Sequence, residues 1–242
     1  MVRNKVDFFE ILQFRQLGLE DFYDFLNLGY KITASAGSDL PWGNTIGEVR
    51  MYAHTGQGFS ADDWFEAVRQ GHTFVTNGPM VSLYVDGGIP GDEVKVAKGT
   101  KVRVRARAWA PRSIGSPKSM EVVAHGRVIR SAESSDPENP GLNLDFKIHA
   151  DESQLIAVRA NSNNGAVAHT TPVYLLVDGE NFRAKEQVPK LVEKRLKILN
   201  FIAGRLQDPK LTDTYGRGEV EALTEEIAQA KARYEALMSD RQ

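Results

Sequence analysis

The sequence predicts a mixed fold with an α/β part, an all-β sandwich of immunoglobulin-like size and a helical tail. Three observations predict it. Over residues 1–79, strand-like apolar segments are interspersed with segments whose apolar residues have helical spacing. Over residues 80–180, short strands of alternating apolar and polar residues are separated by turn residues. Apolar residues at helical spacing then return over residues 181–242. We therefore expect three successive regions with boundaries near residues 79 and 180.

Composition and charge are close to those of an average soluble globular protein. The 242 residues are 41% hydrophobic and 26% charged, with a net charge of −2, which gives no reason to expect nucleic acid or an anionic membrane as a partner. The absence of cysteine excludes disulfides, Cys-ligated zinc, iron–sulfur clusters and a cysteine nucleophile. No apolar run approaches the roughly 18 residues of a membrane span.

The first residues do not have the pattern of a signal peptide, because Asp7 and Glu10 stand inside the apolar run. The sequence leaves open whether the protein is exported. The chain enters a strand almost at once, so we expect Met1 not to be the true beginning of the fold.

The α/β part begins with a strand–helix–strand unit. Val6–Leu12 predicts a strand with two largely apolar faces, which is typical of a strand covered on both sides in a parallel sheet. Apolar residues at helical spacing predict a helix over Gly18–Leu28, ended by Gly29. Lys31–Ala36 is the next expected strand, and the unit should be right-handed.

A second unit of the same kind follows. Glu48–His54 alternates like a strand. Ser60 is an expected helix N-cap with Asp63 at the third helical position, and Gly71 ends that helix. Thr73–Thr76 is a short strand that runs into an Asn-Gly-Pro turn.

The sandwich is predicted from six strand-like segments with turn signals between or within them. They are Val81–Asp86, Thr100–Ala110, Ser119–Ile129, Leu142–Ala150, Gln154–Asn161 and Ala166–Val177.

The tail is predicted to hold two helices joined by a polar loop over Gln207–Gly218. Pro189 lies near the first turn of the first helix. In the second helix, apolar residues step by three and four from Val220 to Leu237, which indicates a heptad seam. Such a seam suits either an antiparallel hairpin within the chain or a partner helix, so a homo-oligomer is one expectation.

Asp39 is the leading candidate for chemistry. It follows the break at Gly37, just past the strand Lys31–Ala36. In α/β sheets, functional groups collect where strands end, so Asp39 is either a metal ligand or general base, or a turn aspartate that binds nearby backbone N–H groups.

Glu10 and Arg50 are candidates to work with Asp39. Glu10 stands within an apolar strand, where a buried carboxylate needs a partner; the alternative is a strand-end residue that reaches solvent or an arginine. Arg50 follows on the strand after the Asp39 loop. It could bind an anionic substrate group, or be a structural ion-pair partner of either acid.

The five histidines form no close metal-binding spacing. They are His54, His72, His125, His149 and His169. His54 is the histidine nearest the α/β loops, so it belongs either to the site or to a strand end; the others are expected to be structural or surface residues. The alternating basic residues from Lys101 to Arg107 are expected to form the solvated face of a sandwich strand. No phosphate-binding loop, dinucleotide fingerprint or nucleophile elbow is present, so spacing and composition alone predict no reaction.

The motifs together resemble the C-terminal half of CehA/McbA-type metallohydrolases of the PHP (polymerase and histidinol phosphatase) superfamily. The resemblance covers roughly residues 5–180, and its most specific part is TNGP followed by a sandwich strand. The segments that carry it are VDFFEIL, ITASAGSDLPWG, GEVRMYAH, FSADDWFEAVRQGHTFVTNGP, LYVDGGIPGDEV and AHTTPVYLLVDG.

The resemblance implies a partial PHP-type (β/α) barrel over residues 1–79, followed by the sandwich. In this family zinc, iron or manganese activates a water that attacks an ester, carbamate or phosphoester. Asp39 matches the last metal-ligand position, and Glu10 matches a glutamate with a ligand-supporting or substrate-facing role. Arg50 and Asn77 match positions near the barrel mouth; with His54 they are the expected substrate-binding residues.

The sequence also departs from the family pattern at several metal-ligand and motif positions. The family's H-x-H pair is absent, the D-x-H of the last motif reads Asp39-Leu40-Pro41, and His72 stands where arginine is expected. We therefore expect the C-terminal part of a metal-dependent hydrolase of small esters or phosphoesters, inactive alone and without the metal of the complete protein. The alternative is a non-catalytic sandwich module for binding or assembly.

Overall fold

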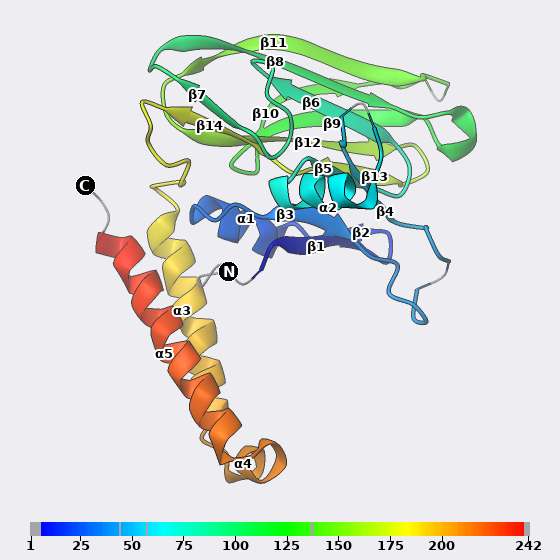
Figure 1. Cartoon of the computed structure of the whole chain (residues 1–242). Coiled ribbons are helices and arrows are strands. Elements are labelled where there is room, and N and C mark those ends of the chain that lie inside the picture. The colour runs from blue at the N-terminus through cyan, green and yellow to red at the C-terminus, as the bar shows by residue number, and fades with distance from the viewer. Residues whose placement is uncertain (1–5, 44, 57, 137, 240–242) are drawn as a thin grey trace. The chain divides into compact units, whose positions relative to one another are not determined.

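The computed structural model describes residues 6–43, 45–56, 58–136 and 138–239, and it divides into two compact units. The first comprises residues 6–182 and the second the described residues from 183 onward. The first is mixed α/β with mostly sheets, and the second is helical (Figure 1). The boundary expected near residue 79 therefore falls inside the first unit.

The predicted strand–helix–strand unit is present. Strands β1 (Phe8–Gln13) and β3 (Thr33–Ala36) pair in parallel, and α1 (Glu20–Asn27) connects them. A two-residue strand, β2 (Gln16–Leu17), pairs with the end of β1. The helix buries Phe22, Tyr23 and Leu26, as its apolar spacing predicts.

Strand β1 is not covered on both faces. Phe9 packs its ring against Phe22 and Phe25 of α1, whereas Phe8 is 53% exposed. The pairing with β3 shifts between Glu10 and Leu12, so a bulge interrupts the alternation. As a result Ile11 and Leu12 are both buried, and Glu10, predicted as a buried carboxylate, is exposed.

The second helix, α2 (Ala61–Gln70), has the predicted ends. The Ser60 hydroxyl accepts a hydrogen bond from the Asp63 N–H, and Gly71 caps the other end with φ 78°. The strands on either side, β4 (Arg50–Ala53) and β5 (Thr73–Thr76), pair with each other in antiparallel fashion. Strand β5 also pairs with β13 (Val167–Thr170), so this segment extends a sheet of the sandwich.

Two sheets face each other across the main core. One has three strands in the order β11–β8–β6, and the larger has the path β10–β9–β12–β13–β5–β4, with β14 and β7 attached through β12. Their bounds are β6 (Met80–Val85), β7 (Glu93–Val96), β8 (Thr100–Trp109), β9 (Pro117–Ala124), β10 (Arg127–Glu133), β11 (Gly141–Ala150), β12 (Gln154–Ser162) and β14 (Val173–Val177). A short 3-10 turn, Arg112–Ile114, precedes β9.

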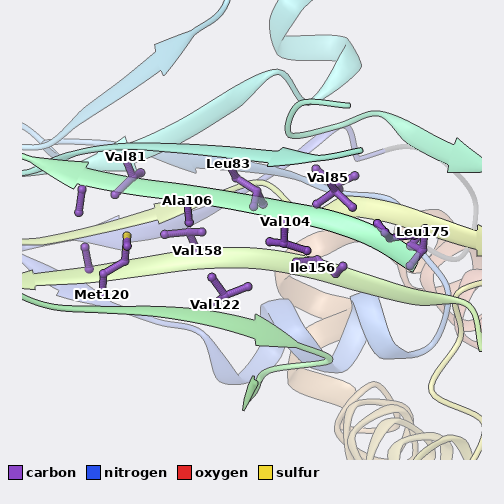
Figure 2. Packing of buried hydrophobic residues seen from close by; sticks show 14 of the residues in the cluster. Val81, Leu83, Val85, Val104, Ala106, Met120, Val122, Ile156, Val158 and Leu175 are labelled. Atoms are coloured by element: carbon purple, nitrogen blue, oxygen red, sulfur yellow. The ribbon is translucent and has the colours of Figure 1, made fainter. Parts of the chain in front are cut away.

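The core between the sheets is formed by alternating strand residues. Figure 2 shows Leu83 and Val104 from the small sheet beside Val122 and Ile156 from the large one. The exposed residues of β8 alternate with the buried ones, so its basic side chains form a solvated face, as predicted. Full burial of each large aliphatic side chain contributes roughly 1.5–3 kcal/mol, so this core is the main stabilising feature of the unit.

The helical unit contains α3 (Val188–Arg205), α4 (Pro209–Tyr215) and α5 (Arg217–Ser239). Helices α3 and α5 pack side by side, as an intrachain hairpin requires (Figure 1). Of the predicted heptad seam, Ile227 and Tyr234 are buried, while Leu223 is 51% exposed. Helix α4 occupies most of the segment predicted to be a polar loop, since Pro209 is compatible with the first turn of a helix.

Candidate functional site

The structure places the Glu10 carboxyl group, from the middle of β1, beside the turn after β3 that carries Asp39. Glu10 lies opposite Ser35 in the β1–β3 pairing, and Asp39 follows three residues after the end of β3. A Cβ at Gly37 would lie 2.5 Å from Oε2 of Glu10, so the carboxyl group rests directly against this glycine. Glycine at this position therefore makes room for the Glu10 carboxyl group beside the turn that carries Asp39.

The electrostatics of the pair follow from this geometry. Partial burial of the carboxyl group raises the pKa of Glu10 above its ordinary value, and the nearby negative charge of Asp39 raises it further. Asp39 itself has a φ of 48°, in the left-handed region that Asp tolerates better than most residues. The two carboxylates thus repel each other, and a bound cation or proton would relieve that repulsion.

The pair alone does not fit a complete metal centre. In the part of the chain that the structure describes, no group of three or more histidine, aspartate or glutamate side chains could hold a metal ion. Structural and catalytic zinc sites use at least three protein ligands, and Glu10 and Asp39 supply two carboxylates. A zinc ion held here would need further protein ligands.

Arg50 and Asn77 lie at one end of the β4–β5 ladder. Arg50 is directly opposite Thr76, the residue before Asn77. The Asn77 side-chain oxygen accepts a hydrogen bond from the Val167 N–H at 2.7 Å, which ties the turn to β13. Arg50 Nε and Asn77 Nδ2 are buried without a hydrogen-bond partner among the described residues. Asn77 therefore has a structural role in this turn, and each residue keeps one buried donor without a partner among the described residues.

His54 lies at the other end of the same ladder. Its N–H donates to the His72 carbonyl oxygen at 2.8 Å, just beyond the Ala53–Thr73 pair. Four residues of strand separate His54 from Arg50, which corresponds to about 13 Å at 3.3 Å per residue. The three residues predicted to bind substrate are thus not gathered at one point; His54 instead lines a separate cavity.

His72 and His169, expected to be structural or surface histidines, both have structural partners. His72 Nε2 lies 3.0 Å from Asp92 Oδ1, beside the cavity that His54 lines. His169 is fully buried: the Tyr23 hydroxyl lies 2.8 Å from its Nε2, and Nδ1 lies 2.7 Å from the Thr170 carbonyl oxygen. Burial lowers the pKa of His169 to about 4, so this histidine is a neutral structural link between α1 and β13.

Comparisons with known proteins assign no family. The sequence matches no protein-family model and no curated protein. Fibronectin(III)-like modules of Clostridium thermocellum CbhA are 20% identical, with a TM-score of 0.29, and the match covers 45% of this chain and 48% of that one. A crystal structure of an engineered protein is 16% identical over 40% of this chain and 20% of its own, with a TM-score of 0.26. Neither match supports a conclusion about this protein.

None of the described helices combines the length and the apolar character that crossing a bilayer requires.

Proposed function

We propose that the chain is the C-terminal part of a PHP-type metal-dependent hydrolase that cleaves an ester, carbamate or phosphoester. Glu10 and Asp39 contribute two carboxylates to its metal centre, and the remaining ligands come from a segment outside this chain. The supporting observation is that the Glu10 carboxyl group, from the middle of β1, lies against Gly37 in the turn that carries Asp39 after β3. The resemblance of the GSD and TNGP motifs to the family supports the same assignment.

The role of the chain's own residues follows from their chemistry. Carboxylate oxygens are ligands for zinc, manganese and iron, and such a metal in the complete protein would supply an activated water. Arg50 and Asn77 match positions near the barrel mouth of the family, and a guanidinium and a side-chain amide suit an anionic or carbonyl oxygen of a substrate. With two carboxylates, the chain alone binds a divalent cation weakly and does not turn over substrate.

Manganese titration followed by NMR tests this proposal. At millimolar Mn²⁺, we expect paramagnetic broadening of the Gly37 and Ser38 amide signals in the chain itself. The Asp39→Asn variant should abolish the broadening, while Asp62→Asn, a matched change in the first turn of α2, should leave it unchanged. Broadening of these signals that is unchanged in the Asp39→Asn variant would contradict the assigned site. If the chain alone bound one Mn²⁺ tightly, and if Asp39→Asn abolished that binding, the result would contradict the proposal that other ligands are missing.

A second candidate function is assembly through the helical unit. Ile198, Phe201 and Ile202 of α3 lie on one helical face at i, i+3 and i+4, and Phe201 is 69% exposed. Leu223 of α5, in the same helical unit, is 51% exposed as well. Exposed apolar side chains at such spacing are typical of a helix that packs against another copy. This observation favours a homo-oligomer through the tail.

Light scattering at several concentrations tests assembly. We expect the chain to be a dimer or larger, and the double variant Phe201→Ser/Ile202→Ser to be monomeric with unchanged helix content. The control Phe65→Ser removes a ring that is 52% exposed on α2, and it should not change the mass. A chain that is monomeric before the substitutions would rule out this second function.

A further inference from the structure

A mainly apolar cavity of about 300 Å³ lies where β4 and β5 meet the edge of β6. Its aromatic walls are Tyr52, Phe74 and Trp109, and Leu83 and Pro90 complete the apolar lining. The Tyr52 and Phe74 rings are stacked, with centroids 5.0 Å apart and planes within 7°. Sites for small molecules are concave, mostly apolar and begin at about this volume. The cavity therefore has the size and lining for one aromatic ring system.

A polar groove of about 470 Å³ adjoins this cavity on the outer face of the three-stranded sheet. Arg105 and Arg107 of β8 and Asn143 and Asp145 of β11 line it. Three residues line both the groove and the cavity: Ser82, Tyr84 and Trp109. The two spaces therefore adjoin along these shared side chains.

The groove carries more positive charge than Asp145, which lies opposite Arg105 in the β8–β11 pairing, can neutralise. Asp145 accepts hydrogen bonds from Arg103, at 2.8 Å from Nε and 2.5 Å from Nη2, so its charge is already compensated. Within the described residues, neither Arg105 nor Arg107 forms an ion pair with a carboxylate. Their guanidinium carbons instead lie 5.1 Å from the ring centroids of Tyr84 and Trp109, respectively.

This arrangement favours an anion next to the apolar cavity. A guanidinium that stacks on an aromatic face keeps its N–H donors at the edge of its plane, where they can hold a carboxylate. The same rings that carry the two arginines also border the cavity. An anionic group at the arginines and an apolar ring in the cavity would thus belong to one small molecule.

We propose that this is a binding site for a small aromatic carboxylate, with its ring in the cavity lined by Tyr52, Phe74 and Trp109 and its carboxylate at Arg105 and Arg107. The site is distinct from the Glu10–Asp39 pair in the residues that form it. It does not depend on the proposed hydrolase function, and its test uses no metal, so the two can fail separately.

Calorimetric titration of the full chain with 2-naphthoate tests the proposal, with neutral 2-naphthamide as the matched ligand. We expect 2-naphthoate to bind at least about tenfold more tightly than the amide. The double variant Arg105→Gln/Arg107→Gln should remove that difference. The control Lys101→Gln/Lys147→Gln removes two positive charges from the same sheet face outside the groove, and it should keep the difference.

The position of the ring is tested with Tyr52→Ala, which opens the cavity wall at a side chain that is already 38% exposed. We expect about tenfold weaker binding of 2-naphthoate and no change for acetate. Equal affinities for naphthoate and naphthamide would overturn the proposal, as would an equal loss in the lysine control. Tighter binding of an acidic monosaccharide such as galacturonate than of 2-naphthoate would overturn the assignment of an aromatic ligand.

Discussion

The sandwich core and the Glu10–Asp39 pair have opposite physical designs. In the core, side chains such as Val104 and Ile156 are sealed from water, and each contributes to stability through buried apolar area. In the acidic pair, two like charges lie near each other, and the Glu10 side chain is exposed. Their repulsion opposes folding. The contrast shows that the core holds the fold together and the acidic pair does not.

The largest expected effect comes from the core side of this comparison. Ile156→Ala removes a fully buried side chain and leaves a cavity, so we expect the free energy of unfolding to fall by roughly 3 kcal/mol. Ile129→Ala on β10, where the side chain is 37% exposed, should cost less than about 1 kcal/mol. Urea unfolding of the two variants measures the difference. Equal losses would mean that the two-sheet core is not the main stabilising feature.

The next effect is a pH dependence that also arises from burial. The pKa of His169 is about 4 in the folded chain, against 6.5 for the unperturbed side chain. The unfolded chain therefore binds this proton first as the pH falls. The stabilisation of the folded state by neutral His169 is fully present above pH 6.5 and is lost progressively as the pH falls toward 4.

The expected loss from His169 is about 3 kcal/mol, since one pKa unit corresponds to about 1.4 kcal/mol. Urea unfolding at pH 7, 6, 5 and 4 measures it. In a His169→Gln variant the free energy of unfolding should depend clearly less steeply on pH over this range. Part of the dependence should remain because burial also lowers the pKa of His125. An unchanged slope in the variant would show that His169 is protonated in the fold.

A smaller effect is expected at Gly37, where the acidic pair meets the backbone. In Gly37→Ala the new methyl would lie 2.5 Å from Glu10 Oε2, but the end of this side chain is free to rotate away. We expect a loss of about 1 kcal/mol or less, together with a lower pKa of Glu10, because its carboxyl group moves toward water. The control Gly18→Ala places its Cβ in open space. A Glu10 pKa in Gly37→Ala identical to that of the native chain would refute the described contact.

Local sequence signals predicted many of the elements. Helix α2 was predicted from Ser60, Asp63 and Gly71, because capping depends on residues close in sequence. The buried and exposed faces of β8 followed from simple alternation. The pairing of β5 with β13 was not predicted, since it joins Val75 to His169 across many residues, and no local pattern specifies such a partner.

The candidate site was predictable to a similar degree. Asp39 was found because strand ends carry functional groups, and Glu10 because a carboxylate interrupts an apolar strand. The exposure of Glu10 was one of the two alternatives left open by the sequence, and the bulge beside it has no clear sequence signature here. The separation of His54 from Arg50 depends on their positions at opposite ends of β4 and on the antiparallel pairing with β5.

The most direct test of the acidic pair is the pKa of Glu10, measured by NMR titration of its side-chain carboxyl carbon. The Glu10 pKa should lie above its ordinary value in the native chain. In Asp39→Asn it should fall but remain somewhat raised, because burial is the larger cause and the charge of Asp39 the smaller. An identical Glu10 pKa in the two proteins would contradict the claim that these carboxylates form one coupled pair.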